Sequence, residues 1–217
     1  MKILFVSPHP DDETLGCGGT ILNHKKKRDK IYWHILTSIE ENDEYFLKRK
    51  KEIQKVKKYY KFDEVIQENF ITGNLDTYPK KNVISKIEKL IKRIKPDMIY
   101  LPYEYDFHSD HKIVFECYKP FFKSFRYPFI KTIKQYEVLS ETNLANIKNK
   151  IFAPNNFVDI TKSLKKKITI MKMYKSEIKK FPFPRSKDTI EALAKTRGSQ
   201  INVKYAEAFI ILKHVEV

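Results

Sequence analysis

Two short segments combine histidine with closely spaced carboxylates. Residues 9–13 read His-Pro-Asp-Asp-Glu, and residues 106–111 read Asp-Phe-His-Ser-Asp-His. Each segment follows an apolar run and would lie on a loop directly after a buried strand. Carboxylates gathered at one place repel each other unless a cation offsets their charge. If the fold brings the two segments together, their residue types therefore predict a metal site.

The mixture of ligands narrows the choice of metal. Two imidazoles and one carboxylate leave coordination positions open, as in catalytic zinc sites, where the pKa of water falls from ~15.7 toward ~7. Fe²⁺ accepts the same ligands. A single loop histidine is more often a hydrogen-bonded structural residue than a metal ligand. Two such clusters at the ends of two central strands reverse that preference.

The elements around these segments predict a Rossmann-like α/β fold. Apolar strands at 3–6 and 98–101 precede the two clusters, and strands alternate with helices along the first half of the chain. This alternation favours a mostly parallel sheet flanked by helices, in a single domain over residues 1–217. In a sheet of order 3-2-1-4 the first and fourth strands are neighbours, and ligands bind beyond their carboxyl ends. The expected strands are 3–6, 31–37, 65–66, 98–101, 135–139 and 206–212, and the expected helices are 14–28, 46–60, 82–95, 112–122, 160 to about 175 and 189–194, with a loop at 154–156.

Composition limits the class of protein. Of 217 residues, 41% are hydrophobic and 13% aromatic, which indicates a folded chain. No apolar run reaches the ~18–20 residues of a membrane span, and the apolar N-terminal stretch is too short for a signal peptide. We therefore expect a cytoplasmic protein whose two cysteines, Cys17 and Cys117, are reduced packing residues. The net charge of +16 favours an anionic partner, which can be a phosphate-bearing substrate, nucleic acid or a membrane surface.

The two clusters resemble the motifs of the LmbE-like, or PIG-L, family of zinc-dependent de-N-acetylases. Members of this family remove acetyl groups from N-acetylglucosamine-type sugars. The resemblance rests on Pro-His-Pro-Asp-Asp-Glu at 8–13 and His-Ser-Asp-His at 108–111, and it implies the LmbE-like fold over essentially the whole chain. Further segments that resemble the family are 136–137, 140–142, 154–155, 158–160, 184–186, 197–198 and 205–209.

The resemblance implies which residues of the two clusters bind the metal and which one acts as the base. His9, Asp12 and His111 would be the metal ligands, and Asp11 the general base that takes a proton from water. Neighbouring residues in extended chain point in opposite directions, which is consistent with only one aspartate being a ligand. Glu13 would either support the ligands or cap the loop.

Other residues would act on the substrate or orient the ligands. By the resemblance, a protonated His108 would stabilise the tetrahedral oxyanion, and Asp110 would orient a histidine. Arg49, in an Arg-x-x-Glu spacing, would bind the substrate, and Arg185 and Arg197 would face an anionic group. For Arg49 a structural pairing with a nearby glutamate is an equal alternative.

Two further residues have open or structural interpretations. Asp106 has the same two interpretations as Glu13, because it can either support a metal ligand or cap its loop. Glu207 is expected to be a structural anchor.

Three other functional classes compete with this interpretation. Glycines 16, 18 and 19 lack the G-x-G-x-x-G spacing of NAD-binding proteins, so we expect them to allow close helix packing instead. A metal-dependent phosphoesterase would use similar ligands at strand ends. A basic nucleic-acid-binding protein would use the charge, but the lysines are scattered and no binding motif is present. Chelation should abolish acetate release by a deacetylase and phosphate release by a phosphoesterase.

The expected function is metal-dependent hydrolysis of the N-acetyl, or N-acyl, amide of an amino sugar. The products would be acetate and a free amine. The expected cofactor is Zn²⁺, with Fe²⁺ as the alternative. The expected partner is a small, anionic amino-sugar substrate, with no nucleic acid and no stable membrane insertion, and homo-oligomer formation stays open.

Overall fold

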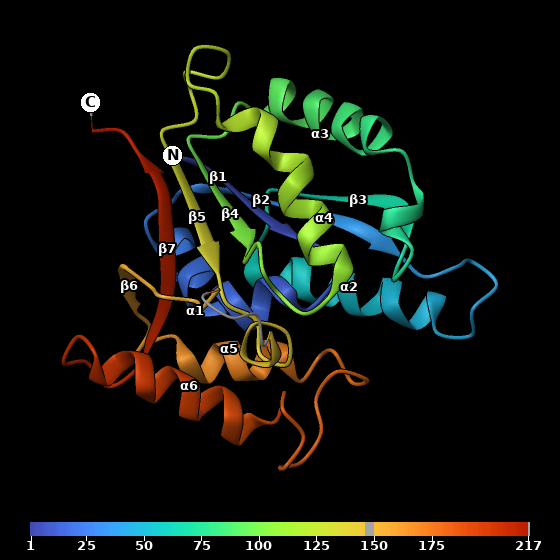
Figure 1. Cartoon of the computed structure of the whole chain (residues 1–217). Helices are drawn as coiled ribbons and strands as arrows, with labels where there is room; N and C mark the ends of the chain where they lie inside the picture. Colours follow the sequence, from blue (N-terminus) through green and yellow to red (C-terminus); the bar gives the residue numbers. More distant parts are fainter. Residues whose placement is uncertain (146–149, 217) are drawn as a thin grey trace.

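A seven-stranded sheet forms the centre of the molecule (Figure 1). The computed structural model describes residues 1–145 and 150–216. The strand order is β3-β2-β1-β4-β5-β7-β6, in which the first five strands along the chain are parallel and β7 runs antiparallel to both β5 and β6. The order 3-2-1-4 and the mostly parallel sheet expected from the sequence are confirmed. The strands are β1 (Lys2–Ser7), β2 (Lys30–Ser38), β3 (Glu64–Ile71), β4 (Met98–Pro102), β5 (Thr132–Tyr136), β6 (Asn156–Asp159) and β7 (Ala206–His214).

Helices cover both faces of the sheet and bury one hydrophobic cluster on each side. Figure 1 shows α3 and α4 on one face and α1, α2, α5 and α6 on the other. Among the described residues, no helix is both long and apolar enough to cross a bilayer. The helices are α1 (Asp12–Lys26), α2 (Phe46–Tyr60), α3 (Lys80–Ile94), α4 (Ser109–Tyr118), α5 (Leu164–Met171) and α6 (Lys187–Ser199), with short 3₁₀ turns at Leu75–Thr77, Lys119–Phe122 and Thr142–Leu144.

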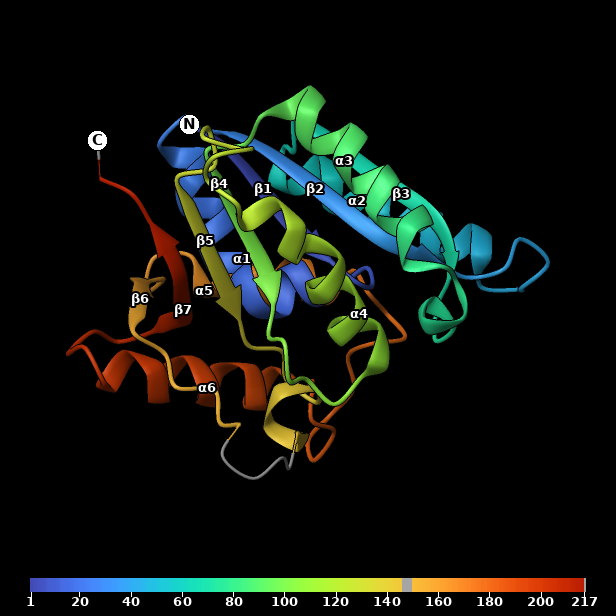
Figure 2. The ribbon, with the colours of Figure 1, turned by 45° about the horizontal axis from the view of Figure 1, so that its top comes forward.

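The central strands β1 and β4 are direct neighbours, which positions the site. Phe5 of β1 lies opposite Tyr100 of β4 in parallel register, and Figure 2 shows the two strands side by side in the sheet. Side chains 3–6 of β1 are fully buried, as expected for a parallel strand covered on both faces. Both histidine clusters therefore leave the sheet at the same edge.

Glycines bring α1 unusually close to its neighbours. A Cβ at Gly16 would lie 2.2 Å from Cδ2 of Tyr136, and one at Gly19 would lie 2.4 Å from Cγ2 of Ile160. Atoms cannot approach so closely, so only glycine fits at these points. The expected packing role of these glycines is confirmed. Cys17 and Cys117 are buried and unpaired, which agrees with their expected role as packing residues.

The second half of the chain departs from the sequence-based boundaries. The fifth strand covers 132–136 instead of 135–139, because Lys134 lies within it and disguises the strand pattern. Asn156–Asp159 pairs with β7 as an edge strand, where the Pro-Asn sequence predicted a loop at 154–156. The helix expected from 160 to about 175 is limited to Leu164–Met171, whereas the helix expected at 189–194 extends over Lys187–Ser199. The helix expected at 112–122 begins at Ser109 and ends at Tyr118, followed by a 3₁₀ turn.

Candidate active site

The first cluster lies on the sharp connection between β1 and α1. Asp11 stands at the N-terminus of α1 with a φ of 130°, which is a strained conformation for any residue other than glycine. Its carbonyl oxygen accepts hydrogen bonds from the N–H groups of Thr14 and Leu15, both at 2.9 Å, and so begins the helix. Asp11 and Asp12 diverge because of this turn. The extended chain assumed from the sequence is wrong here.

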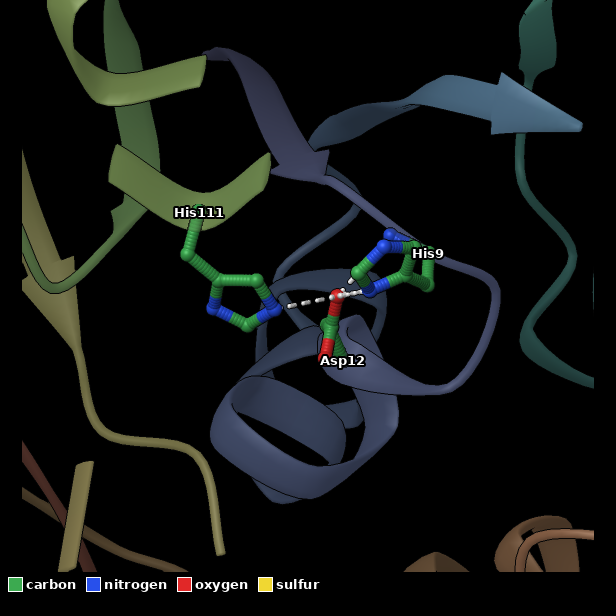
Figure 3. Close-up of side chains that lie close together, drawn as sticks. All are labelled: His9, Asp12 and His111. Carbon is green, nitrogen blue, oxygen red and sulfur yellow. Dashed lines mark hydrogen bonds and ion pairs between the residues drawn. The ribbon is translucent and has the colours of Figure 1, made fainter. Parts of the chain in front are cut away.

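Three side chains from the two clusters converge on one point. Oδ2 of Asp12 lies 3.5 Å from Nδ1 of His9 and 3.3 Å from Nε2 of His111 (Figure 3). The ring centroids of the two histidines are 5.4 Å apart. One donor atom from each residue lies within 4.8 Å of the others, which is compatible with shared coordination at ~2 Å per bond. The structure therefore brings together the three residues that the sequence predicted as metal ligands.

The donor set fits a metal ion for a second reason. Nε2 of His111 is fully buried and has no hydrogen-bond partner among the described residues, although it points toward the Asp12 carboxylate. A buried polar atom without a partner is costly. A cation held by His9, Asp12 and His111 would satisfy this nitrogen and balance the neighbouring carboxylate.

Carboxylates hold both histidine rings in place. Oδ2 of Asp106 lies 2.7 Å from Nδ1 of His111, and Oδ2 of Asp110 lies 2.9 Å from Nε2 of His9. Each contact uses the ring nitrogen away from Asp12, so the other nitrogen is free to bind a metal. Asp110 therefore contacts a histidine in the way expected of an orienting residue. Asp106 contacts the other histidine and also accepts the Thr142 hydroxyl at 2.5 Å, so its carboxylate holds a histidine and a loop residue at once.

Glu13 supports the loop instead of the histidines. Its carboxylate accepts hydrogen bonds from the Asp11 N–H, the Thr14 hydroxyl and the Tyr174 hydroxyl at 3.1, 2.5 and 2.8 Å. Burial raises the pKa of Glu13 to about 7 against these hydrogen bonds. The side chain fixes the backbone that presents Asp11 to the cleft.

Burial and close charges set the protonation of the cluster. Burial lowers the pKa of His9, but hydrogen bonds to Asp110 and Asp12 outweigh this and raise it to about 9. Burial favours the neutral form of Asp12, yet the charge of the nearby His111 lowers its pKa well below the usual range. Burial, together with the charge of Asp12, raises the pKa of Asp11 well above its usual value. Of the two adjacent aspartates, Asp11 is thus the more basic.

A cleft of about 320 Å³ opens beside the cluster. Asp11 and His108 line it from opposite clusters, as the sequence predicted for groups that touch the substrate. The cleft is also lined by His9, Pro10, Asp12, Ser38, Ile39, Arg49, Gln67, Thr72, Val138, Glu141, Glu177 and Arg185.

His108 is arranged to donate a hydrogen bond as a neutral imidazole. Its Nδ1 accepts the Asp110 N–H at 3.1 Å and thereby caps the N-terminus of α4. Because Nδ1 accepts, the proton of a neutral ring must be on Nε2. Burial and the neighbouring rings of His9 and His111 lower the pKa of His108. The protonated His108 expected from the sequence is therefore disfavoured, whereas its position in the cleft agrees with the prediction.

The three arginines predicted to bind substrate have different environments. Arg49 and Arg185 both line the cleft. Nη1 of Arg185 lies 3.2 Å from Oδ2 of Asp11 and 3.1 Å from Oε2 of Glu177. Arg197 lies outside the cleft, where it forms a two-pronged ion pair with Glu137 at 2.7 Å for each contact. The geometry gives Arg197 a structural partner in Glu137 and does not place it in the lining of the cleft.

Arg49 lines the cleft and is also paired with glutamates. Its guanidinium faces the cleft and donates to the carbonyl oxygen of Pro10 at 3.4 Å. It also pairs with Glu52 at 3.4 Å and with Glu177 at closer range. A structural pairing and a place at the substrate cleft therefore coexist.

Some lining residues were not predicted from the sequence. Glu177 pairs with both cleft arginines, but it lies in the irregular segment between α5 and α6, outside residues 184–186 that resemble the family. Thr72 directly follows β3, and Ser38 is the last residue of β2. Their position at the carboxyl edge of the sheet could therefore have been inferred once the ends of both strands were known. Glu141 lies within a segment that resembles the family, yet its type gave no role.

Comparison with known proteins links both clusters to one family. The family described as PIG-L, GlcNAc-PI de-N-acetylase, matches residues 4–121, which is more than half of the chain. The matched range includes all three residues that converge at the candidate metal site.

Three solved structures share the fold. N,N'-diacetylchitobiose deacetylase from Pyrococcus horikoshii is 22% identical with a TM-score of 0.76, and the match covers 98% of this chain and 84% of that chain. The conserved protein TT1542 from Thermus thermophilus is 23% identical with a TM-score of 0.77, covering 99% and 96%. GalB, a 4-carboxy-2-hydroxymuconate hydratase from Pseudomonas putida KT2440, is 15% identical with a TM-score of 0.75, covering 100% and 98%. Because one of them is a hydratase, the fold alone does not specify the reaction.

Proposed function

This chain belongs to the PIG-L family of GlcNAc-PI de-N-acetylases, and on that premise we propose that it hydrolyses the N-acyl amide of an amino sugar with the help of a divalent metal. The substrate would be an N-acetylglucosamine-type glycoside, sugar nucleotide or glycolipid, and the products acetate and the free amine. One observation carries the proposal. His9, Asp12 and the unpartnered Nε2 of His111 converge on one point, beside a cleft of about 320 Å³ that Asp11 lines.

The residues of this chain that would hold the metal are His9, Asp12 and His111. Zinc is the proposed ion, and Fe²⁺ suits the same ligands. When bound, the metal would polarise the amide carbonyl and increase the acidity of water in the cleft. The contacts of Asp106 with His111 and of Asp110 with His9 would fix the orientation of both imidazole ligands.

Asp11 would act as the general base. Its carboxylate lines the cleft next to the ligand Asp12 and has a raised pKa, so it can accept a proton from water as the oxygen adds to the amide carbon. The same proton can then pass to the amide nitrogen as the C–N bond breaks. Arg185, at 3.2 Å from Oδ2 of Asp11, would hold the carboxylate in this position.

His108 would stabilise the negative charge that develops on the carbonyl oxygen. Its Nδ1 is engaged by the Asp110 N–H, which directs the Nε2–H donor away from α4 and toward the cleft that it lines. A neutral imidazole is sufficient for such a donor role. Arg49 would bind a hydroxyl or phosphate oxygen of the substrate, because its guanidinium remains at the cleft while pairing with Glu177.

The experiment that tests the function follows both products. Zinc-loaded protein is incubated with N-acetylglucosamine, its nucleotide diphosphate conjugate and thiol-precursor glycosides, and acetate and primary amine are quantified. We expect equal release of both from at least one substrate, loss of release with a chelator, and recovery when zinc or Fe²⁺ is restored. Release of phosphate without amine, or amine release that survives chelation, would reject the proposal.

A further inference from the structure

A second hollow, of about 600 Å³, lies at the edge of the sheet opposite the catalytic cleft. It is bounded by Met1 and Met98, which stand where β1 and β4 begin, whereas the clusters of the cleft follow the ends of these strands. The two cavities share no lining residue. A six-residue strand at ~3.3 Å per residue separates them by ~16 Å or more. Nothing in the deacetylase chemistry uses this hollow.

Lys134 is the central charged group of the hollow. It occupies the middle of β5, opposite Tyr100 of β4, on the same face of the sheet as Tyr136, which packs against α1. Its Nζ lies 5.6 Å from the ring centroid of Tyr100 and 5.8 Å from that of Phe209. The Lys134 side chain is half-buried against these two rings.

The ammonium of Lys134 has only one polar partner among the residues that the structure describes. Nζ donates to Oδ1 of Asn156 on the edge strand β6 at 2.8 Å, which leaves two of its three donors open to a ligand. Within the same described part of the chain, no carboxylate forms an ion pair with it. Burial lowers the pKa of Lys134, and the charge of Lys27 contributes to this, because both disfavour the ammonium. An anion in the hollow would remove this penalty.

The other charged groups that face the hollow make it positive. Lys26 and Lys27 contribute two cations from the end of α1, and Lys26 donates to the Ser163 hydroxyl at 3.2 Å. Among the described residues that line the hollow, the only carboxylate is Asp159, which accepts the Thr161 N–H at 2.8 Å. The lysines therefore outnumber the carboxylate in the lining of this hollow.

Neighbouring groups do not cancel this excess. The N-terminal ammonium of Met1 is paired with Asp29 at 2.8 Å, so these two charges offset each other. Burial lowers the pKa of His24, which leaves its imidazole neutral between Asp29 and the Tyr100 hydroxyl. The net positive charge thus comes from Lys26, Lys27 and Lys134.

The remaining wall of the hollow is apolar. Met98, Phe157 and Val158 line it beside the lysines. A ligand that fills this space gains most if it carries a compact anionic group and an apolar body. A phosphate monoester carries about −1.5 to −2 charges at neutral pH, which suits a hollow lined by three lysines better than a monovalent carboxylate does.

We propose that this hollow binds a small phosphate monoester with an apolar body, whose phosphate pairs with Lys134 and whose body lies against Met98 and Phe157. Lys26 and Lys27 complete the anion site from α1. The hydrogen bond to Asn156 directs the Lys134 ammonium toward the edge strand β6, in the part of the sheet where β5, β7 and β6 are neighbours (Figure 1). The site is independent of the deacetylase activity, because the hollow and the cleft are separately lined.

The test is an NMR titration of the zinc-loaded protein with phenyl phosphate and, separately, inorganic phosphate, in 0.15 M NaCl. We expect saturable shifts of the amide signals around the hollow and tighter binding of phenyl phosphate than of inorganic phosphate. Lys134→Met should weaken phenyl phosphate binding about tenfold or more, the scale of one lost hydrogen bond to a charged group. Deacetylase activity should be unchanged in this variant.

Lys25→Met is the matched control, because it removes one charge from the same helix while Lys25 pairs with Asp63 outside the hollow. Its affinity for phenyl phosphate should stay within about twofold of the parent, as expected for a residue that makes no contact with the ligand. If Lys134→Met does not fold, the double variant Lys26→Met with Lys27→Met should show the loss instead. Absence of saturable shifts at the hollow, equal weakening by Lys25→Met, or shifts confined to the catalytic cleft would overturn the proposal.

Discussion

The Asp110 carboxylate contacts the His9 imidazole at 2.9 Å, although 101 positions separate the two residues in the chain. The same carboxylate accepts the N–H groups of Gly73 and Leu75 at 2.8 and 3.2 Å. Asp110, in the first turn of α4, thus joins the β1–α1 connection and the segment after β3 at the carboxyl edge of the sheet. This contact explains how a site assembled from distant segments can be rigid before any ligand is present.

The first prediction concerns Asp110 as a support for the metal ligand His9. Asp110→Asn should keep the fold but weaken zinc binding by about 10–100-fold, the usual effect of removing a carboxylate that orients a ligating histidine. His111→Ala, by comparison, should lose metal and activity together. Zinc content after dialysis against a competing chelator measures both variants. Normal zinc content in His111→Ala would show that the ligands are wrongly assigned.

The second prediction separates the base from the ligands. Asp11→Asn should retain zinc and lower kcat by about 10²–10⁴-fold, because the variant cannot accept a proton from water. Asp12→Asn is the matched control at the adjacent position, and it should lose zinc as well as activity. Metal analysis and steady-state kinetics on both variants test this. Equal metal loss in the two variants would mean that Asp11 is itself a ligand.

The third prediction distinguishes two roles of His108, which caps α4 and lines the cleft. His108→Ala should lower kcat with zinc content near normal, and should also cost about 1 kcal/mol in stability through the lost cap. His108→Asn restores a good capping side chain without an imidazole. We therefore expect this variant to recover the melting temperature but not the turnover. Recovery of both would reduce His108 to a structural residue.

The strand ends that carry the chemistry could be predicted from the sequence for a simple physical reason. The strands before both clusters are buried on both faces and therefore appear as uninterrupted apolar runs. Because β1 and β4 are parallel neighbours, the residues that follow them lie at the same edge of the sheet. His9 and His111 lie shortly after these strands in the sequence, within the two motifs that contain the metal-binding residue types. This is why the convergence of His9, Asp12 and His111 could be predicted from the sequence.

Other parts of the site depend on packing that no local pattern reveals. Glu177 reaches the cleft from an irregular segment, where neither periodicity nor a turn signal indicates its direction. The positive φ of Asp11 arises from the tight connection between β1 and α1, and the sequence there predicted an extended chain. Lys134 interrupts the apolar pattern of β5, which shifted the predicted strand by three residues.

The last prediction concerns stability in acid and a buried pair far from the cleft. His34 is fully buried in β2, with Nδ1 2.6 Å from the Tyr118 hydroxyl, and burial lowers its pKa. The contact with His34 and an ion pair with Lys86 lower the pKa of Glu68 to about 2. The pKa values of both His34 and Glu68 are therefore lower in the folded chain than in the unfolded chain. Protonation therefore favours unfolding for each of them.

The lowered pKa of His34 contributes fully to the unfolding free energy above the unfolded pKa of ~6.5, and this contribution is lost as the pH falls below that value. The contribution of Glu68 to the unfolding free energy is lost between pH ~4.5 and about 2. We expect Glu68→Gln to flatten the fall in unfolding free energy between pH ~4.5 and about 2. Glu88→Gln, which removes an exposed carboxylate paired with Lys92, should leave the curve unchanged. Thermal unfolding from pH 7 to 2.5 with chelator present measures all three proteins, and parallel curves for Glu68→Gln and the parent would contradict the assignment.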